Sequence, residues 1–236
     1  MKSRRRFYKT VDLSQAGGIL LDGKPVRTPM KAALVLPTVE LARAVAGEWE
    51  AQGEKIVPAT MPLTRLANTA IDRVSPDRPR IVAEMLDFAG SDLTCYRAEA
   101  PPDLVERQAL AWNPVLAWAA ASLDATFLVT AGIVHRPQPE AALKAVRSHL
   151  DGLDPFVLTA LHNLMTLTGS LLISAMTLAG KLEPEAAWLA AHTDEDYQIA
   201  QWGEDTEARQ RRDLRHREFL ACCRFAGLAA ANQTEA

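Results

Sequence analysis

The chain has 236 residues, of which 48% are hydrophobic and 23% charged, so we expect a globular protein with one large or two small domains. Its net charge of −3 argues against general nucleic-acid binding, and its three cysteines form neither a disulfide framework nor a metal pattern. No apolar segment follows the basic start, SRRRFYK, as an export signal requires. We therefore expect a cytoplasmic protein.

The first sixty residues have the pattern of a small sheet with one helix. Four short runs rich in β-branched or aliphatic residues are separated by Gly, Pro and Asp-Gly signals, which predicts an antiparallel sheet. They are residues 7–11, 18–21, 25–28 and 33–36. Asp22-Gly23 is a typical hairpin turn. Thr38 is expected to cap a helix that ends near residue 52 and buries Trp49.

From residue 61 the apolar residues recur with helical spacing almost to the end of the chain. This predicts a second domain, 61–236, built from several helices. The expected helices cover residues 63–74, 81–89, a segment that begins near 101, 140–150 and 184–191. Pro114 should kink or restart the third of these, with Asn113 as an internal cap, and Trp112 lies next to that break as a structural residue.

Residues 154–180 contain no Lys, Arg or Glu after Asp154, and we expect them to form one helix. Asp154 is a good N-cap and Gly180 suits the position just past the end. The run is long enough to span a membrane, but it lacks flanking Lys/Arg clusters and an aromatic belt. This favours a core helix without stable membrane insertion. The expected fold is α+β, a small antiparallel sheet followed by a multihelical orthogonal bundle organised around this helix.

That helix carries a narrow neutral polar stripe, which includes His162 and Asn163. The stripe either lines an open groove or is an internal polar seam, and the seam is favoured because buried polar groups normally find partners. A buried catalytic pair of His162 and Asn163 is the alternative to a satisfied core cluster.

Signatures of known catalytic chemistry are missing from the sequence. No P-loop, G-x-G-x-x-G or G-x-S-x-G motif occurs, and the five histidines have no metal-ligand spacing. We therefore predict no catalytic residues, no metal and no cofactor. An enzyme that uses an acidic pair near Asp194 and Glu195 remains the alternative, with a non-catalytic helical adaptor as a third reading.

One segment is unusual electrostatically. Eight acidic residues and no Lys or Arg lie between Lys181 and Arg209, and five arginines follow within nine residues. Within this segment Tyr197 and Trp202 stand among carboxylates, a combination of aromatic anchors and steering charge that suits a protein-binding surface. The alternative is a solvated helix face with both aromatic side chains turned inward.

Several blocks of the sequence resemble the ATP synthase assembly chaperone family. They include GGILLDGKPVRTP, LPTVELARAVAGEWEAQGEKI, MPLTRLANTAIDRV and DEDYQIAQWGED. The resemblance implies a two-domain chaperone without catalytic activity that binds the free α subunit of the catalytic head, without ATP, until the β subunit replaces it. It also implies a cytoplasmic location for a bacterial chain and the mitochondrial matrix for eukaryotic relatives. The residues expected to contact the client are Glu195, Tyr197, Gln198, Trp202 and Glu204.

Overall fold

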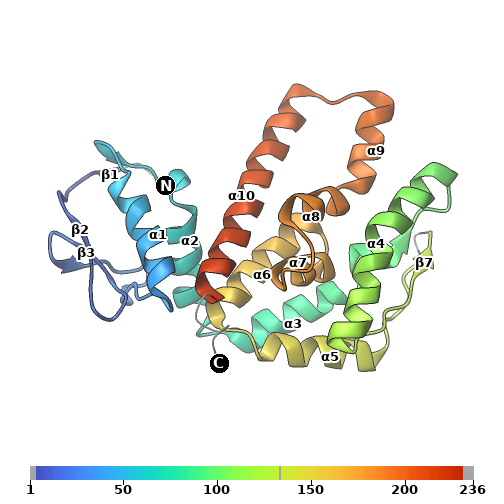
Figure 1. Ribbon diagram of the computed structural model, residues 1–236, viewed down its shortest axis with the longest axis horizontal. Helices are drawn as coiled ribbons and strands as arrows, with labels where there is room; N and C mark the ends of the chain where they lie inside the picture. The colour runs from blue at the N-terminus through green and yellow to red at the C-terminus, as the bar shows by residue number, and fades with distance from the viewer. Residues whose placement is uncertain (1–3, 133, 231–236) are drawn as a thin grey trace. The chain divides into compact units, whose positions relative to one another are not determined.

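The computed structural model describes residues 4–132 and 134–230 and has an α+β fold, as predicted (Figure 1). The described chain divides into two compact units. The first contains residues 4–78, 154–160 and 221–230, and the second contains 79–153 and 161–220. The domain boundary predicted near residue 60 stays a prediction.

A three-stranded antiparallel sheet forms one part of the first unit. Its order is β2 (Val11–Leu13), β3 (Ile19–Leu21) and β4 (Lys24–Pro25). Asp22 and Gly23 join β3 to β4 with φ angles of 49° and 76°, the left-handed pair that an Asp-Gly hairpin turn uses. The predicted hairpin is therefore confirmed.

The predicted strand at residues 33–36 is reduced to two isolated bridges, Gly18 with Val35 and Arg27 with Ala33. The residues just before it form a tight turn, in which the Thr28 N–H donates to the Ala32 carbonyl at 2.9 Å. This turn leaves few residues to pair as a strand. A separate antiparallel pair joins β1 (Arg4–Arg5) to β5 (Lys55–Ile56).

Helix α1 (Val39–Glu50) begins where the sequence predicts, because the Thr38 side chain accepts a hydrogen bond from the Leu41 N–H at 3.1 Å. A 3₁₀ turn, η1 (Pro58–Thr60), precedes α2 (Pro62–Thr69), and a π-helical segment, η2 (Ala70–Val74), extends α2. The predicted helix 63–74 is thus present, with its last turn widened.

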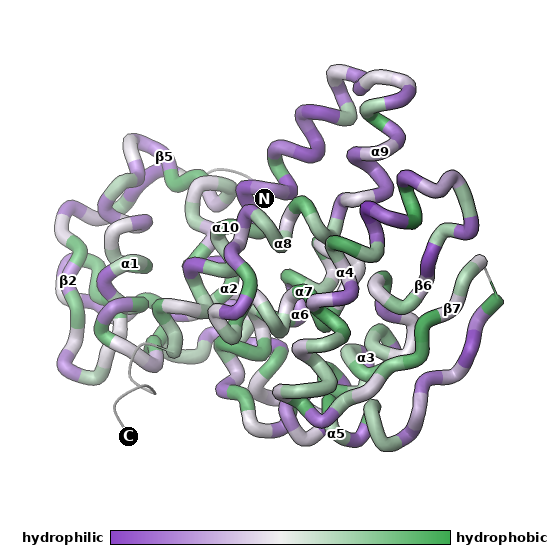
Figure 2. Tube along the Cα trace, turned by 45° about the vertical axis from the view of Figure 1, so that its right-hand side comes forward, coloured by the Kyte–Doolittle hydropathy of each residue, from purple (hydrophilic) through white to green (hydrophobic). Residues whose placement is uncertain are grey.

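Most of the second unit is helical (Figures 1 and 2). Its helices are α3 (Arg78–Ala89), η3 (Leu93–Cys95), α4 (Pro102–Leu123), α5 (Glu140–Asp151), α7 (Leu171–Leu178), α8 (Pro184–Ala191) and α9 (Thr193–Trp202). Helices α6 (Pro155–Thr168) and α10 (Thr206–Ala230) contribute residues to both units. The parallel pair of β6 (Tyr96–Arg97) and β7 (Thr130–Ala131) was not predicted.

The single helix predicted over 154–180 is wrong, because the run contains two helices, α6 and α7. Gly169 adopts a left-handed φ of 71° that ends α6, and Ser170 caps α7 by accepting from the Ile173 N–H at 3.0 Å. The two predicted ends are correct: the Asp154 side chain accepts from the Phe156 N–H, and Gly180 has a φ of 66°.

A fully buried carboxylate, Asp92, holds this break together. It accepts hydrogen bonds from the Ser170 hydroxyl at 2.8 Å and the Leu172 N–H at 3.1 Å, and from the Thr94 N–H and hydroxyl at 3.0 and 2.8 Å. Burial raises the pKa of Asp92, and these donors oppose that rise. The bonds from Ser170 and Leu172 fix the turn between α6 and α7, and those from Thr94 hold Asp92 in place.

Helix α4 does not restart at Pro114, which lies inside one continuous helix. The missing Pro114 N–H would have bonded the carbonyl of Leu110, a residue that is 72% exposed and therefore lies on the solvent side of the helix. Asn113 caps nothing and instead accepts from the Arg97 guanidinium at 3.0 Å. Trp112 is fully buried, and its indole N–H donates to the Ala190 carbonyl at 2.7 Å.

The polar stripe of the α6 and α7 region is largely an internal seam. Ser170 and Ser174 are fully buried, and the hydroxyls of Ser174 and Thr177 donate to main-chain carbonyls one turn earlier at 2.8 and 2.7 Å. Thr166, in contrast, is exposed. Within the described ranges, no helix combines the length and apolar character that crossing a membrane requires.

Candidate functional site

The acidic segment singled out in the sequence folds into one arm of a helical hairpin. Helix α9 and the first half of α10 run in opposite directions, and their connection stands away from the neighbouring helices of the second unit (Figure 1). Gly203 makes the turn with a φ of 83°. The Asp205 carboxylate then caps α10 by accepting from the N–H groups of Glu207 and Ala208 at 3.1 and 3.0 Å.

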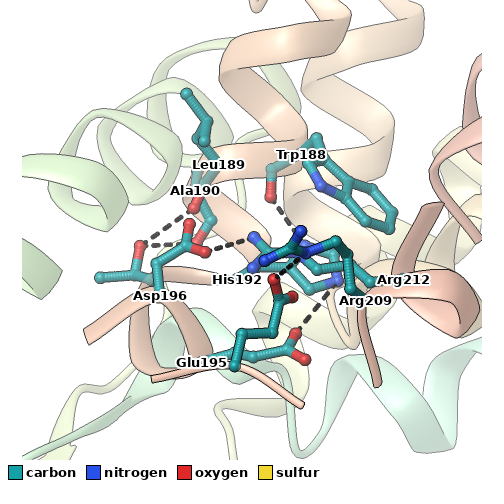
Figure 3. Close-up of polar contacts among 10 residues, drawn as sticks. Trp188, Leu189, Ala190, His192, Glu195, Asp196, Arg209 and Arg212 are labelled. Carbon is teal, nitrogen blue, oxygen red and sulfur yellow. Dashed lines mark hydrogen bonds and ion pairs between the residues drawn. The ribbon is translucent and has the colours of Figure 1, made fainter. Parts of the chain in front are cut away.

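An aromatic cluster supports the base of this hairpin. The Trp188 ring lies 3.8 Å from the His192 ring and 4.8 Å from the His216 ring, centroid to centroid. His192 is buried, and its Nδ1 lies 2.8 Å from the Trp188 carbonyl oxygen (Figure 3). Burial lowers the pKa of His192, so its ring is neutral at pH 7 and packs as an aromatic group.

One ion pair joins the arms of the hairpin, and a second joins the connection to α10. Asp196 on α9 pairs with Arg212 on α10 (Figure 3). Glu204 in the connection pairs with Arg209 at 2.9 Å. Since Arg209 is 65% exposed, its pair contributes little to stability, about 0–1 kcal/mol. In both pairs the basic partner lies on α10.

Four of the five predicted client-contact residues surround one shallow hollow of about 260 Å³ on this hairpin. They are Glu195, Gln198, Trp202 and Glu204, and the same hollow is also lined by Ile199, Gly203, Asp205 and Ala208. Trp202 is 79% exposed, an unusual position for a side chain of that size. The hollow therefore offers one large apolar surface edged by carboxylates.

Tyr197 lies apart from this hollow. Its hydroxyl donates to the Asp103 carboxylate of α4 at 3.2 Å, and the Arg107 guanidinium lies 5.3 Å from its ring centroid. Tyr197 thus fastens α9 to α4. Of the two aromatic residues in the segment, one is turned inward and one outward.

The carboxylates proposed for an enzymatic acidic pair are separated by their contacts. Asp194 accepts from the Gln108 side chain at 2.7 Å, whereas Glu195 is exposed and lies 4.0 Å from the His192 ring nitrogen. Glu195 lines the shallow hollow described above and Asp194 does not, which counts against their acting as an acid–base pair. In the part of the chain that the structure covers, no group of His, Cys, Asp and Glu residues could hold a metal ion.

Ile199 is one of four lining residues outside the predicted set, with Gly203, Asp205 and Ala208. Glu195, Gln198, Ile199 and Trp202 follow the i, i+3, i+4, i+7 spacing of one helix face, and this spacing was a readable signal. Tyr197 does not share this spacing and faces α4 instead.

Comparisons with known proteins point to one family. Residues 5–120 match the family model described as ATP12 chaperone protein. The mitochondrial protein atp12 of Schizosaccharomyces pombe is 26% identical over 236 residues, which cover 91% of this chain and 80% of that protein.

Solved structures give the same result. The crystal structure of Atp12 from Paracoccus denitrificans is 41% identical, covers 95% of this chain and 98% of its own, and superposes with a TM-score of 0.90. A putative chaperone from Agrobacterium tumefaciens is 44% identical, with coverage of 95% and 85% and a TM-score of 0.89. The matched proteins that carry a functional name are called chaperones, not enzymes. The chain belongs to the ATP12 chaperone family.

Proposed function

We propose that this protein is an ATP synthase assembly chaperone that binds the free α subunit, without ATP, and covers its interface until the β subunit replaces it. Family membership supports the general role. The observation that carries the specific proposal is the exposed Trp202 beside the acid-edged hollow at the tip of the hairpin. The proposed compartment is the cytoplasm, as expected for a relative of these bacterial proteins.

The physical need for such a protein follows from subunit assembly. A subunit made before its neighbours exposes the apolar surface that the finished complex buries, and such surfaces aggregate. A chaperone only has to cover that surface reversibly, so it needs no cofactor and no reactive group. The separated carboxylates of the hairpin are consistent with this requirement.

The hairpin has the properties of a reversible binding surface. Tryptophan is among the residue types most enriched in binding hot spots. Because the Trp202 side chain is exposed in the free protein, a client that covers it removes a large apolar surface from water. Glu195 and Asp205 are exposed beside it and attract a basic partner surface during encounter. We therefore expect the client to insert an apolar side chain flanked by Lys or Arg.

The test is co-purification of purified α subunit with the chaperone at micromolar concentration, followed by measurement of Kd. For Trp202→Ala we expect binding at least about tenfold weaker, equal to roughly 1.4 kcal/mol or more, with an unchanged melting temperature. Gln201→Ala is the matched control, because Gln201 is exposed on the same helix but does not line the hollow.

Two results would contradict the proposal. A folded wild-type chaperone that forms no complex with the α subunit removes the function itself. Equal binding by wild type and Trp202→Ala removes the hairpin as the contact surface and leaves the α subunit as partner.

A further inference from the structure

The first unit contains a much larger apolar groove that the function proposed above does not use. Its volume is about 790 Å³, and residues of the β3–β4 hairpin, α1, β5 and α2 line it. Leu21, Val26, Trp49, Ile56 and Met61 form its apolar surface, and Phe7 lies at its edge with 64% of its surface exposed. A groove of this size and composition is typical of a binding site.

Hydrogen bonds and ring packing within the first unit hold the walls of the groove. The Tyr8 hydroxyl donates to the Trp49 carbonyl at 2.6 Å, and their rings meet edge to face with centroids 5.8 Å apart. The Glu48 carboxylate accepts from the N–H groups of Leu63 and Thr64 at 2.8 Å each, which fixes α2 against α1. Little conformational entropy is therefore lost on binding.

The rim of the groove is basic, although the chain as a whole is acidic. Lys24, Arg27 and Arg65 are exposed along it. The Asp22 carboxylate also lies at the rim, but it accepts from the N–H groups of Lys9 and Thr10 at 2.9 Å each. These bonds lower the pKa of Asp22 and direct its charge toward the main chain of Lys9 and Thr10. The rim therefore complements an acidic partner.

A polypeptide segment carries apolar and acidic side chains close together, which matches an apolar groove with basic side chains at its rim. A purely apolar ligand would leave the charges of the rim without a partner group.

We propose that this groove binds an extended segment of the client polypeptide, with apolar side chains in the groove and Asp or Glu side chains against the basic rim. The inference rests on the function proposed above and adds a second contact to it, of opposite charge to the hairpin. A client held at both places would present a basic surface to the hairpin and an acidic segment to the groove.

The experiment uses the full chaperone and overlapping twelve-residue peptides that cover the α-subunit sequence, with binding measured by fluorescence anisotropy. We expect the peptides that bind to combine several apolar residues with Asp or Glu. The double variant Lys24→Glu/Arg27→Glu should bind them at least tenfold more weakly. Arg43→Glu should bind as wild type does, because Arg43 is exposed on α1 but does not line the groove.

Trp202→Ala should leave peptide binding unchanged, since Trp202 belongs to the other surface. The inference is overturned if no peptide binds, or if the rim variant binds the peptides as tightly as wild type. Decanoate, which joins one carboxylate to an apolar chain, is tested as well. The inference is also overturned if decanoate binds wild type more tightly than the rim variant while no peptide binds. Co-purification of the intact α subunit, measured in parallel, separates these outcomes from failure of the proposed function.

Discussion

The groove of the first unit and the hollow of the hairpin differ in every property that governs binding. The groove is about 790 Å³, apolar and basic at its rim, whereas the hollow is about 260 Å³ and edged by carboxylates around one exposed tryptophan. Each surface contains one tryptophan, Trp49 or Trp202. A tryptophan in this chain therefore forms either the wall of a preformed site or a projecting anchor.

The support beneath the two surfaces differs as well. Half-buried Glu48 fixes the wall of the groove through main-chain hydrogen bonds, and burial raises its pKa despite those bonds. The hairpin depends on ion pairs at the surface, such as that of Glu204 with Arg209. Exposed pairs stabilise weakly, so we expect the hairpin to open locally more readily than the groove does.

The largest expected effect on stability is that of Trp49→Arg, compared with the same substitution at Trp202. Trp49→Arg places a cation where the partly buried indole packs against the core of Tyr8, Leu21, Ile56 and Met61, and should lower the free energy of unfolding by about 3 kcal/mol. Trp202→Arg, at an exposed site, should change it by no more than about 0.5 kcal/mol. Urea denaturation measures both. Equal losses of unfolding free energy would show that both tryptophans are equally important for folding, which would contradict the distinction between a wall residue and a projecting anchor.

A smaller effect is expected from Glu48→Ala, which removes the hydrogen-bond acceptor for Leu63 N–H and for the N–H and hydroxyl of Thr64. We expect a loss of about 2 kcal/mol in urea denaturation, because these donors become unsatisfied at the start of α2. Glu50→Ala is the control, since the Glu50 side chain is exposed. If the control is destabilised equally, Glu48 does not fix the groove.

Features determined locally could be predicted from the sequence, and features that need distant partners could not. Thr38, Asp22-Gly23 and Gly180 act within a few residues, so their caps and turns were predicted correctly. The break between α6 and α7 depends on a distant partner. The Asp92 carboxylate, almost eighty residues earlier in the chain, accepts a hydrogen bond from the Ser170 hydroxyl. Thr168-Gly169-Ser170 did carry a local signal, a helix-ending glycine followed by a capping serine.

The same distinction applies to the two surfaces. The hairpin hollow comes from one continuous segment, so its acidic and aromatic residues marked it in the sequence. The groove combines residues scattered between Phe7 and Thr69 that form no sequence motif. Its rim residues Lys24 and Arg27 do not stand out in the sequence, because single basic residues are common on protein surfaces. Only the fold brings Lys24 and Arg27 to the edge of one apolar surface.

The smallest effect should come from Arg212→Ala, which removes the partner of Asp196 between the two arms of the hairpin. We expect a loss of about 1 kcal/mol or less in global stability, because the pair is partly exposed, together with faster amide hydrogen exchange in α9. Arg211→Ala is the matched control, since Arg211 pairs with Glu207 within α10 and joins no other helix. Exchange in α1 should not change in either variant. Unaltered exchange in α9 would mean that the aromatic cluster around Trp188, rather than the ion pair, holds the hairpin, and that its tip is as firmly fixed as the groove.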